Sequence, residues 1–73
     1  MPLRNVSVEV AGIVSEVSVK PGDRIEAEET LIVIECMKMM LPCVSPWAGV
    51  VQAVRVEVGA VVSEGQAVVD LEV

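Results

Sequence analysis

An internal repeat is the feature that most constrains how this chain can fold. When the sequence is shifted by 37 positions, Ala11-Gly12-Ile13-Val14 aligns with Ala48-Gly49-Val50-Val51, and no gap is needed afterwards. The matching region runs from residues 11–35 to residues 48–72, and most apolar residues of the first copy meet apolar residues in the second. Self-similarity of this kind is typical of folds built from repeated units. We therefore expect residues 1–73 to form one domain made of two related halves.

Both copies carry the pattern of β-strands. Valines alternate with other residues over 6–10 and 54–58, which predicts strands there. Turn residues occupy equivalent places in Pro21-Gly22-Asp23 and Val58-Gly59-Ala60. The composition is 53% hydrophobic with one aromatic residue, Trp47, so the interior must be aliphatic. We predict an all-β fold of two half-barrels related by a pseudo-twofold axis, each half covering the apolar face of the other.

Composition and charge exclude several classes of function. The net charge is −6, which opposes binding to nucleic acid or to an anionic membrane. The longest run of large apolar residues, 31–34, is far shorter than the ~20 residues needed to span a bilayer. The chain has no histidine and two cysteines, a poor set of ligands for a metal. The first residues lack the apolar core of a signal peptide, so we expect a cytoplasmic protein with reduced cysteines.

A lysine lies just past the end of the first copy, in Glu35-Cys36-Met37-Lys38-Met39. We predict a hairpin of residues 30–36 and 39–45, closed by Met37-Lys38, in which cross-strand partners sum to 75. The predicted pairs are Cys36 with Met39, Glu35 with Met40, Ile34 with Leu41 and Ile32 with Cys43. This register presents Lys38 at a tight, exposed tip between the two halves.

The same register divides the hairpin into two faces. The inner face contains Ile32, Ile34, Leu41 and Cys43, and the outer face contains Val33, Glu35, Met40 and Pro42. The repeat supports this division, because Val33 aligns with Asp70, an unlikely core residue. Cys36 and Cys43 lie four rungs apart, too far for a disulfide.

With these features in place, the sequence resembles the biotinyl domain of biotin-dependent carboxylases and decarboxylases, a branch of the biotinyl/lipoyl attachment family. The family motif Glu-Ala-Met-Lys-Met corresponds to residues 35–39, with Cys36 in place of the usual small residue. Ser45-Pro46-Trp47-Ala48-Gly49 is similar to its Ala-Pro-x-x-Gly segment, and Lys20-Pro21-Gly22-Asp23 to its Lys-x-Gly-Asp turn. The resemblance covers nearly the whole chain.

The resemblance implies a flattened barrel-sandwich hybrid of two four-stranded antiparallel sheets. It also implies that Lys38 carries covalently attached biotin, with Met37 and Met39 as flanking recognition residues and Glu35 and Cys36 completing the motif. The domain would be a carrier without catalytic residues or a metal. Its carboxybiotin arm would shuttle CO2 between biotin carboxylase and carboxyltransferase, or decarboxylase, active sites. The implied partners are these subunits and a biotin protein ligase, and the isolated domain is expected to be monomeric.

Two departures from the family pattern carry structural expectations. The Gly-Gln pair that often precedes the motif-bearing strand is present as Gly65-Gln66 in the second copy but is Glu28-Glu29 in the first. If that turn requires positive φ, Glu28 is mildly strained or the turn differs. The repeat leaves no residues for the protruding thumb loop of some biotinyl domains, so we expect the thumbless type.

Three functions remain open at this stage. A lipoyl carrier shares the repeat and the hairpin lysine, but characteristically has Asp on one side of the lysine and a small residue on the other. An unmodified barrel would be an interaction module in which Lys38 is an ordinary surface amine. Met37 and Met39 would then only fill the apolar flank of the hairpin. The motif favours the biotin carrier among the three.

Overall fold

The computed structural model describes residues 2–73 and consists of eight β-strands joined by turns and loops, with no helix among the described residues. The strands are β1 (Leu3–Ser7), β2 (Gly12–Val17), β3 (Arg24–Ile25), β4 (Thr30–Cys36), β5 (Met39–Val44), β6 (Gly49–Val54), β7 (Val61–Val62) and β8 (Ala67–Glu72). They form two antiparallel sheets, β1-β8-β6-β3 and β5-β4-β2-β7, which we call the β8 sheet and the β4 sheet. The predicted all-β fold of two four-stranded sheets is confirmed.

The two sheets repeat one another at the spacing of 37 residues. Adding 37 to the bounds of β2 and β3 gives those of β6 and β7, and the shifted bounds of β1 and β4 match those of β5 and β8 to within one residue at one end. The irregularities also repeat, since the β2–β4 register shifts between Val14 and Glu16 and the β6–β8 register between Val51 and Ala53. The repeat therefore extends to β1 and β5, whose sequences do not reveal it.

The core between the sheets is aliphatic. Five repeat-related pairs are fully buried: Val14 with Val51, Ile25 with Val62, Leu31 with Val68, Ile32 with Val69, and Ile34 with Leu71. Because each pair contributes one side chain from each half, neither half can bury its apolar face alone. Burial of each such side chain contributes about 1.5–3 kcal/mol to the stability of the fold.

The predicted strands over 6–10 and 54–58 are only partly correct. β1 ends at Ser7 and β6 at Val54, so Val8, Val10, Val56 and Val58 lie outside the strands. Val8 is nevertheless buried, and its backbone exchanges hydrogen bonds with the Gly65-Gln66 turn. The β1–β8 register shifts between Val6 and Ser7, which ends the regular ladder although the valine pattern continues.

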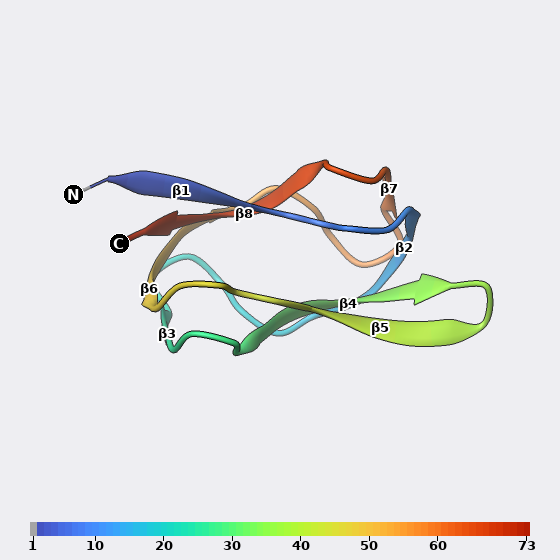
Figure 1. The fold of residues 1–73 in the computed structure, drawn as a ribbon, viewed down its shortest axis with the longest axis horizontal. Coiled ribbons are helices and arrows are strands. Elements are labelled where there is room, and N and C mark those ends of the chain that lie inside the picture. The colour runs from blue at the N-terminus through green and yellow to red at the C-terminus, as the bar shows by residue number, and fades with distance from the viewer. Residues whose placement is uncertain (1) are drawn as a thin grey trace.

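The molecule is elongated, with principal extents of 36 × 18 × 17 Å. Both termini lie at one end of the long axis, and the β4–β5 hairpin projects at the other (Figure 1). At the terminal end the Val73 amide donates to the Pro2 carbonyl over 3.0 Å. The 37-residue repeat makes this contact equivalent in position to the closing turn of the β4–β5 hairpin. One end of the domain therefore contains a continuous turn, and at the other end the two ends of the chain lie together.

Candidate functional site

The β4–β5 hairpin has the predicted register. Cys36 pairs with Met39, Glu35 with Met40, Ile34 with Leu41 and Ile32 with Cys43, with an irregularity only toward Thr30. Two residues, Met37 and Lys38, close the turn. The structure thus places Lys38 at the tip of the hairpin and brings all five motif residues together around it.

The closing turn has an unusual backbone. Met37 has φ of +53° and Lys38 has φ of +66°. Positive φ at both central residues is the mark of a type I′ turn, which matches the twist of the flanking strands and normally contains Asn or Gly. Each non-glycine residue in this region costs about 1–2 kcal/mol. The turn therefore holds a lysine and a methionine where local stability favours other residues, which is typical of a functional site.

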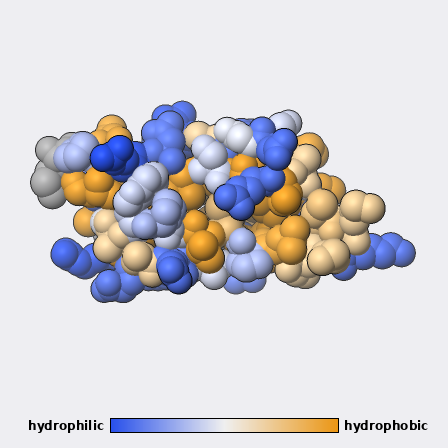
Figure 2. All heavy atoms as spheres, in the orientation of Figure 1, coloured by the Kyte–Doolittle hydropathy of each residue, from blue (hydrophilic) through white to orange (hydrophobic). Residues whose placement is uncertain are grey.

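The tip is open to solvent. Met37 is 89% exposed and Met39 60% exposed, and Lys38 and Glu35 are also exposed, whereas Cys36 is half-buried. Within residues 2–73 the ion pairs are Lys20 with Asp23 and Arg55 with Asp70, and neither involves Lys38. Figure 2 shows hydrophobic surface around this end of the molecule, with hydrophilic atoms projecting beyond it. An exposed amine next to such an apolar surface is accessible to a modifying enzyme.

The two faces of the hairpin are also as predicted. Ile32 and Ile34 are buried, and Leu41 and Cys43 half-buried, on the inner face, whereas Glu35, Met40 and Pro42 are exposed on the outer face. Both cysteines are free thiols. The inference drawn from Asp70 is wrong in one respect, because this residue as a whole is buried at 7% exposure. It still lies on the outer face, where Arg55 covers it.

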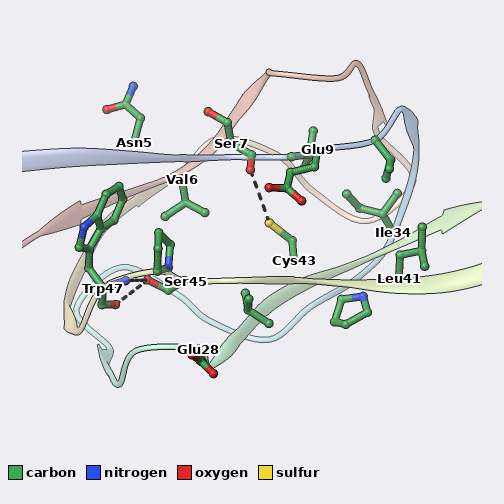
Figure 3. A pocket seen from close by; sticks show the side chains of 15 residues that line it. Asn5, Val6, Ser7, Glu9, Glu28, Ile34, Leu41, Cys43, Ser45 and Trp47 are labelled. Carbon is green, nitrogen blue, oxygen red and sulfur yellow. Dashed lines mark hydrogen bonds between the residues drawn. The ribbon is translucent and has the colours of Figure 1, made fainter.

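A groove between β1 and β5 was not predicted from the sequence. These are edge strands of different sheets, and the space between them encloses about 660 Å³ (Figure 3). Its lining includes the buried side chains of Val6 and Ile34, and the Cys43 Sγ faces the Ser7 carbonyl across it at 4.0 Å. Trp47 lies at one end, half-buried and with Arg4 5.7 Å from its ring centroid. Because β1 and β5 show no sequence similarity, nothing in the repeat indicated that they face one another.

The residues present fit a covalently attached cofactor better than a metal. An exposed primary amine on a fixed turn can form an amide with a carboxylic acid cofactor, and Lys38 meets this requirement. Residues 2–73 contain no cluster of three or more His, Cys, Asp or Glu side chains arranged to hold a metal ion. Nor does this part of the chain contain a helix long and apolar enough to cross a membrane.

Comparison with known proteins places this arrangement among cofactor carriers. The biotin/lipoyl family model, described as "biotin-requiring enzyme", matches residues 1–71. The biotin/lipoyl attachment protein of Bacillus subtilis is 38% identical over 66 residues, covering 90% of both chains. The dihydrolipoyllysine-residue acetyltransferase component of the pyruvate dehydrogenase complex of Pseudomonas aeruginosa is 42% identical over 62 residues, or 85% of this chain. The alpha chain of human mitochondrial propionyl-CoA carboxylase is 41% identical over 61 residues, or 84% of this chain.

The chain spans only 11% of that acetyltransferase component and 8% of that carboxylase chain. Among solved structures, urea carboxylase from Kluyveromyces lactis superposes with a TM-score of 0.91 over 99% of this chain and 6% of its own, at 24% identity. A single-chain, multi-domain long-chain acyl-CoA carboxylase superposes with a TM-score of 0.86 over 93% of this chain and 7% of its own, at 31% identity. The relatives thus include both lipoyl and carboxylase proteins.

Proposed function

The chain belongs to the biotin/lipoyl attachment family, and from this premise we propose that it is a biotin carboxyl carrier modified at Lys38. The domain itself performs no catalysis. Biotin, once attached, supplies a ring nitrogen that accepts and returns CO2, and the chain supplies the tether and its orientation. The partners would be a biotin protein ligase and the biotin carboxylase and carboxyltransferase, or decarboxylase, of the parent enzyme.

The observation that carries the proposal is the methionine on each side of an exposed turn lysine. Met37 and Met39 are among the most exposed hydrophobic residues of the chain, so a modifying enzyme can make apolar contacts with them beside the amine. The flanks also match the biotinyl motif and lack the aspartate characteristic of lipoyl carriers. The carboxylase relatives and neighbours agree with this choice.

Attachment requires a partner enzyme. Attack by an amine requires its unprotonated form, and among residues 2–73 neither ion pair involves Lys38. The ligase must therefore supply a base and the activated biotinyl adenylate. The Nζ of Lys38 attacks the acyl carbon, the new C–N bond forms, AMP leaves and the base takes the proton.

A lipoyl carrier is the second candidate, favoured by the 42% identity to a dihydrolipoyllysine-residue acetyltransferase component. Expression with a biotin ligase, and separately with a lipoyl ligase, followed by intact mass measurement, distinguishes the two. We expect a biotinyl increment that is lost in Lys38→Arg and kept in Lys20→Arg, the matched control at the other lysine of the chain. A lipoyl increment alone, or no increment with active ligases, would overturn the proposal.

The acceptor molecule of the parent enzyme and the cytoplasmic setting stay predictions. The relatives and structural neighbours are pyruvate, propionyl-CoA, urea and long-chain acyl-CoA enzymes, and the carrier contributes no acceptor site. Capture of the biotinylated chain on streptavidin from its native host, with identification of the co-purifying subunits, would name the parent enzyme. Recovery of a 2-oxo acid dehydrogenase complex instead would support the lipoyl alternative.

A further inference from the structure

The groove between β1 and β5 has the size and lining of a small-molecule site. Its volume of about 660 Å³ lies within the usual range of about 300–1,000 Å³ for ligand pockets. The lining is mostly apolar and includes Val6, Val8, Leu41 and Val44, with Trp47 at one end. An apolar ring of moderate size is the kind of ligand that this lining would bind.

The polar groups of the groove define the charge of that ligand. The lining includes Glu9 and Glu28, both exposed and both acidic, and the Ser7 carbonyl faces inward. In Figure 3 the Glu9 carboxylate lies beside the Ser7–Cys43 contact. That contact is a weak thiol interaction at 4.0 Å, which leaves the carbonyl available to a better donor. Two carboxylates disfavour an anion, so the groove suits an uncharged ring that carries N–H donors.

The groove is within reach of the hairpin turn. Leu41 lines the groove and follows Lys38 by three residues along β5, a distance of about 10 Å at about 3.3 Å per residue. A lysine stem in series with the valeryl chain of biotin spans this distance. Tethering of this kind gives an effective concentration in the millimolar range. A site with a Kd of about 1 mM would therefore be about half occupied.

We propose that the β1–β5 groove is an intramolecular resting site for the uncharged biotin ring attached to Lys38. The inference rests on the proposed function. The bicyclic ring offers an apolar body to Leu41 and Val44 and two ureido N–H donors to the acceptors of the groove. Carboxylation makes the ring anionic, so Glu9 and Glu28 oppose its return, and the loaded arm remains extended toward a partner active site.

Thiol protection tests the proposal on protein whose biotinylation is first established by intact mass. In a Cys36→Ser background Cys43 is the single thiol, and its alkylation by iodoacetamide, an uncharged reagent, is followed by mass. We expect alkylation about twofold or more slower in the biotinylated than in the unmodified form. A Cys36→Ser, Lys38→Arg double variant exposed to ligase and biotin should react at the unmodified rate.

Nuclear Overhauser contacts then separate ring binding from a general stabilisation of the fold. Contacts between biotin ring protons and the methyl groups of Leu41 or Val44 are expected in the biotinylated form. Equal Cys43 rates together with no ring contact to the groove, in protein that carries the biotinyl increment, would overturn the resting site and leave the carrier function intact. Absence of the increment itself contradicts the carrier function instead.

Discussion

Arg55 and Asp70 form a bidentate ion pair on the outer face of the β8 sheet. The Arg55 Nε lies 2.9 Å from Oδ1 of Asp70, and Nη2 lies 2.7 Å from Oδ2. The Asp70 side chain is 10% exposed, whereas that of Arg55 is 55% exposed. Ser18 and Val33 hold the equivalent positions in the first half. At equivalent positions, the second half thus has an ion pair, whereas the first half has an apolar side chain, Val33.

This difference predicts an unequal effect of single and double substitutions. Arg55→Ala leaves a largely buried carboxylate without its partner, so thermal unfolding should occur several degrees lower. The double variant Arg55→Ser, Asp70→Val installs the pair already present in the first half and should recover most of the loss. Thermal unfolding followed by circular dichroism measures both. A double variant less stable than Arg55→Ala would show that the two halves are not interchangeable here.

Gly12 and Gly49 are equivalent positions that require the absence of a side chain. A Cβ at Gly12 would lie 2.5 Å from the Glu35 carbonyl oxygen, and one at Gly49 would lie 2.6 Å from that of Glu72. We expect Gly12→Ala and Gly49→Ala each to lower the free energy of urea unfolding by about 1–3 kcal/mol.

The two alanine variants should differ in modification. Glu35 pairs with Met40, directly beside the pair that precedes the hairpin turn, whereas Glu72 is beside the chain ends, so only Gly12→Ala displaces the strand that leads to Lys38. Ligase kinetics should show slower biotinylation of Gly12→Ala and a normal rate for Gly49→Ala at a temperature where both are folded. Equal rates for the two would show that the strand shift does not reach the turn.

The sequence predicted the features that depend on local pattern. The repeat and the alternation of Ile32 and Ile34 with Val33 and Glu35 were sufficient to predict the hairpin register, because one face must be buried. The ends of β1 and β6 were missed because the valine pattern continues past their last paired residues, Ser7 and Val54. The β1–β5 groove was missed because it depends on how two edge strands lie across from each other, which no residue pattern in either strand records.

Glu28 tests the expectation of strain at the turn before β4. Its φ is +69°, the region that Gly65 occupies in the second half with φ of +85°. A non-glycine residue in the left-handed conformation lowers the stability of the fold by about 1–2 kcal/mol. Glycine avoids this cost, but the greater conformational entropy that it gives the unfolded chain lowers stability by about 0.5–1 kcal/mol. Glu28→Gly should therefore raise the free energy of urea unfolding by about 0.5–1 kcal/mol.

Replacement of the equivalent glycine in the second half, Gly65, is a matched control with the opposite expected effect. A Cβ at Gly65 would meet no atom within 4 Å, so Gly65→Ala acts through backbone conformation alone. It should lower the free energy of unfolding by about 1 kcal/mol. Stabilisation by both substitutions, or by neither, would contradict the conformational explanation.

Cys43 predicts a pH dependence of stability. Burial in the groove raises the pKa of its thiol above the ordinary value of 9.0, and the nearby Glu9 carboxylate raises that pKa further. The folded state therefore keeps the thiol proton to higher pH than the unfolded state. This contribution to stability is fully present below pH 9.0 and is lost as the pH rises through the folded-state pKa.

Urea unfolding of the native chain and of Cys43→Ser from about pH 8 to about pH 10 would measure this contribution. The native chain should lose stability more steeply over this range, and Cys36 is common to both proteins. Glu9→Gln should reduce the difference in slope without removing it, because burial is the larger cause. Parallel curves for the native chain and Cys43→Ser would show that the thiol does not titrate differently in the folded state.

Met37→Asp tests whether the flanking residue selects the cofactor. Met37 is 89% exposed and has φ of +53°, a conformation that aspartate adopts more readily than methionine, so the fold should be unaffected. Loss of one apolar contact of about 1.5–3 kcal/mol with a biotin ligase should lower the kcat/KM of biotinylation about tenfold or more. Val58→Asp adds the same charge at a 65% exposed site outside the hairpin and should leave the rate unchanged.

A lipoyl ligase should modify Met37→Asp faster than the native chain, because this substitution places aspartate beside the lysine as in lipoyl carriers. Unchanged rates with both ligases would show that the enzymes read the hairpin shape and that the two methionines serve only to cover its apolar flank.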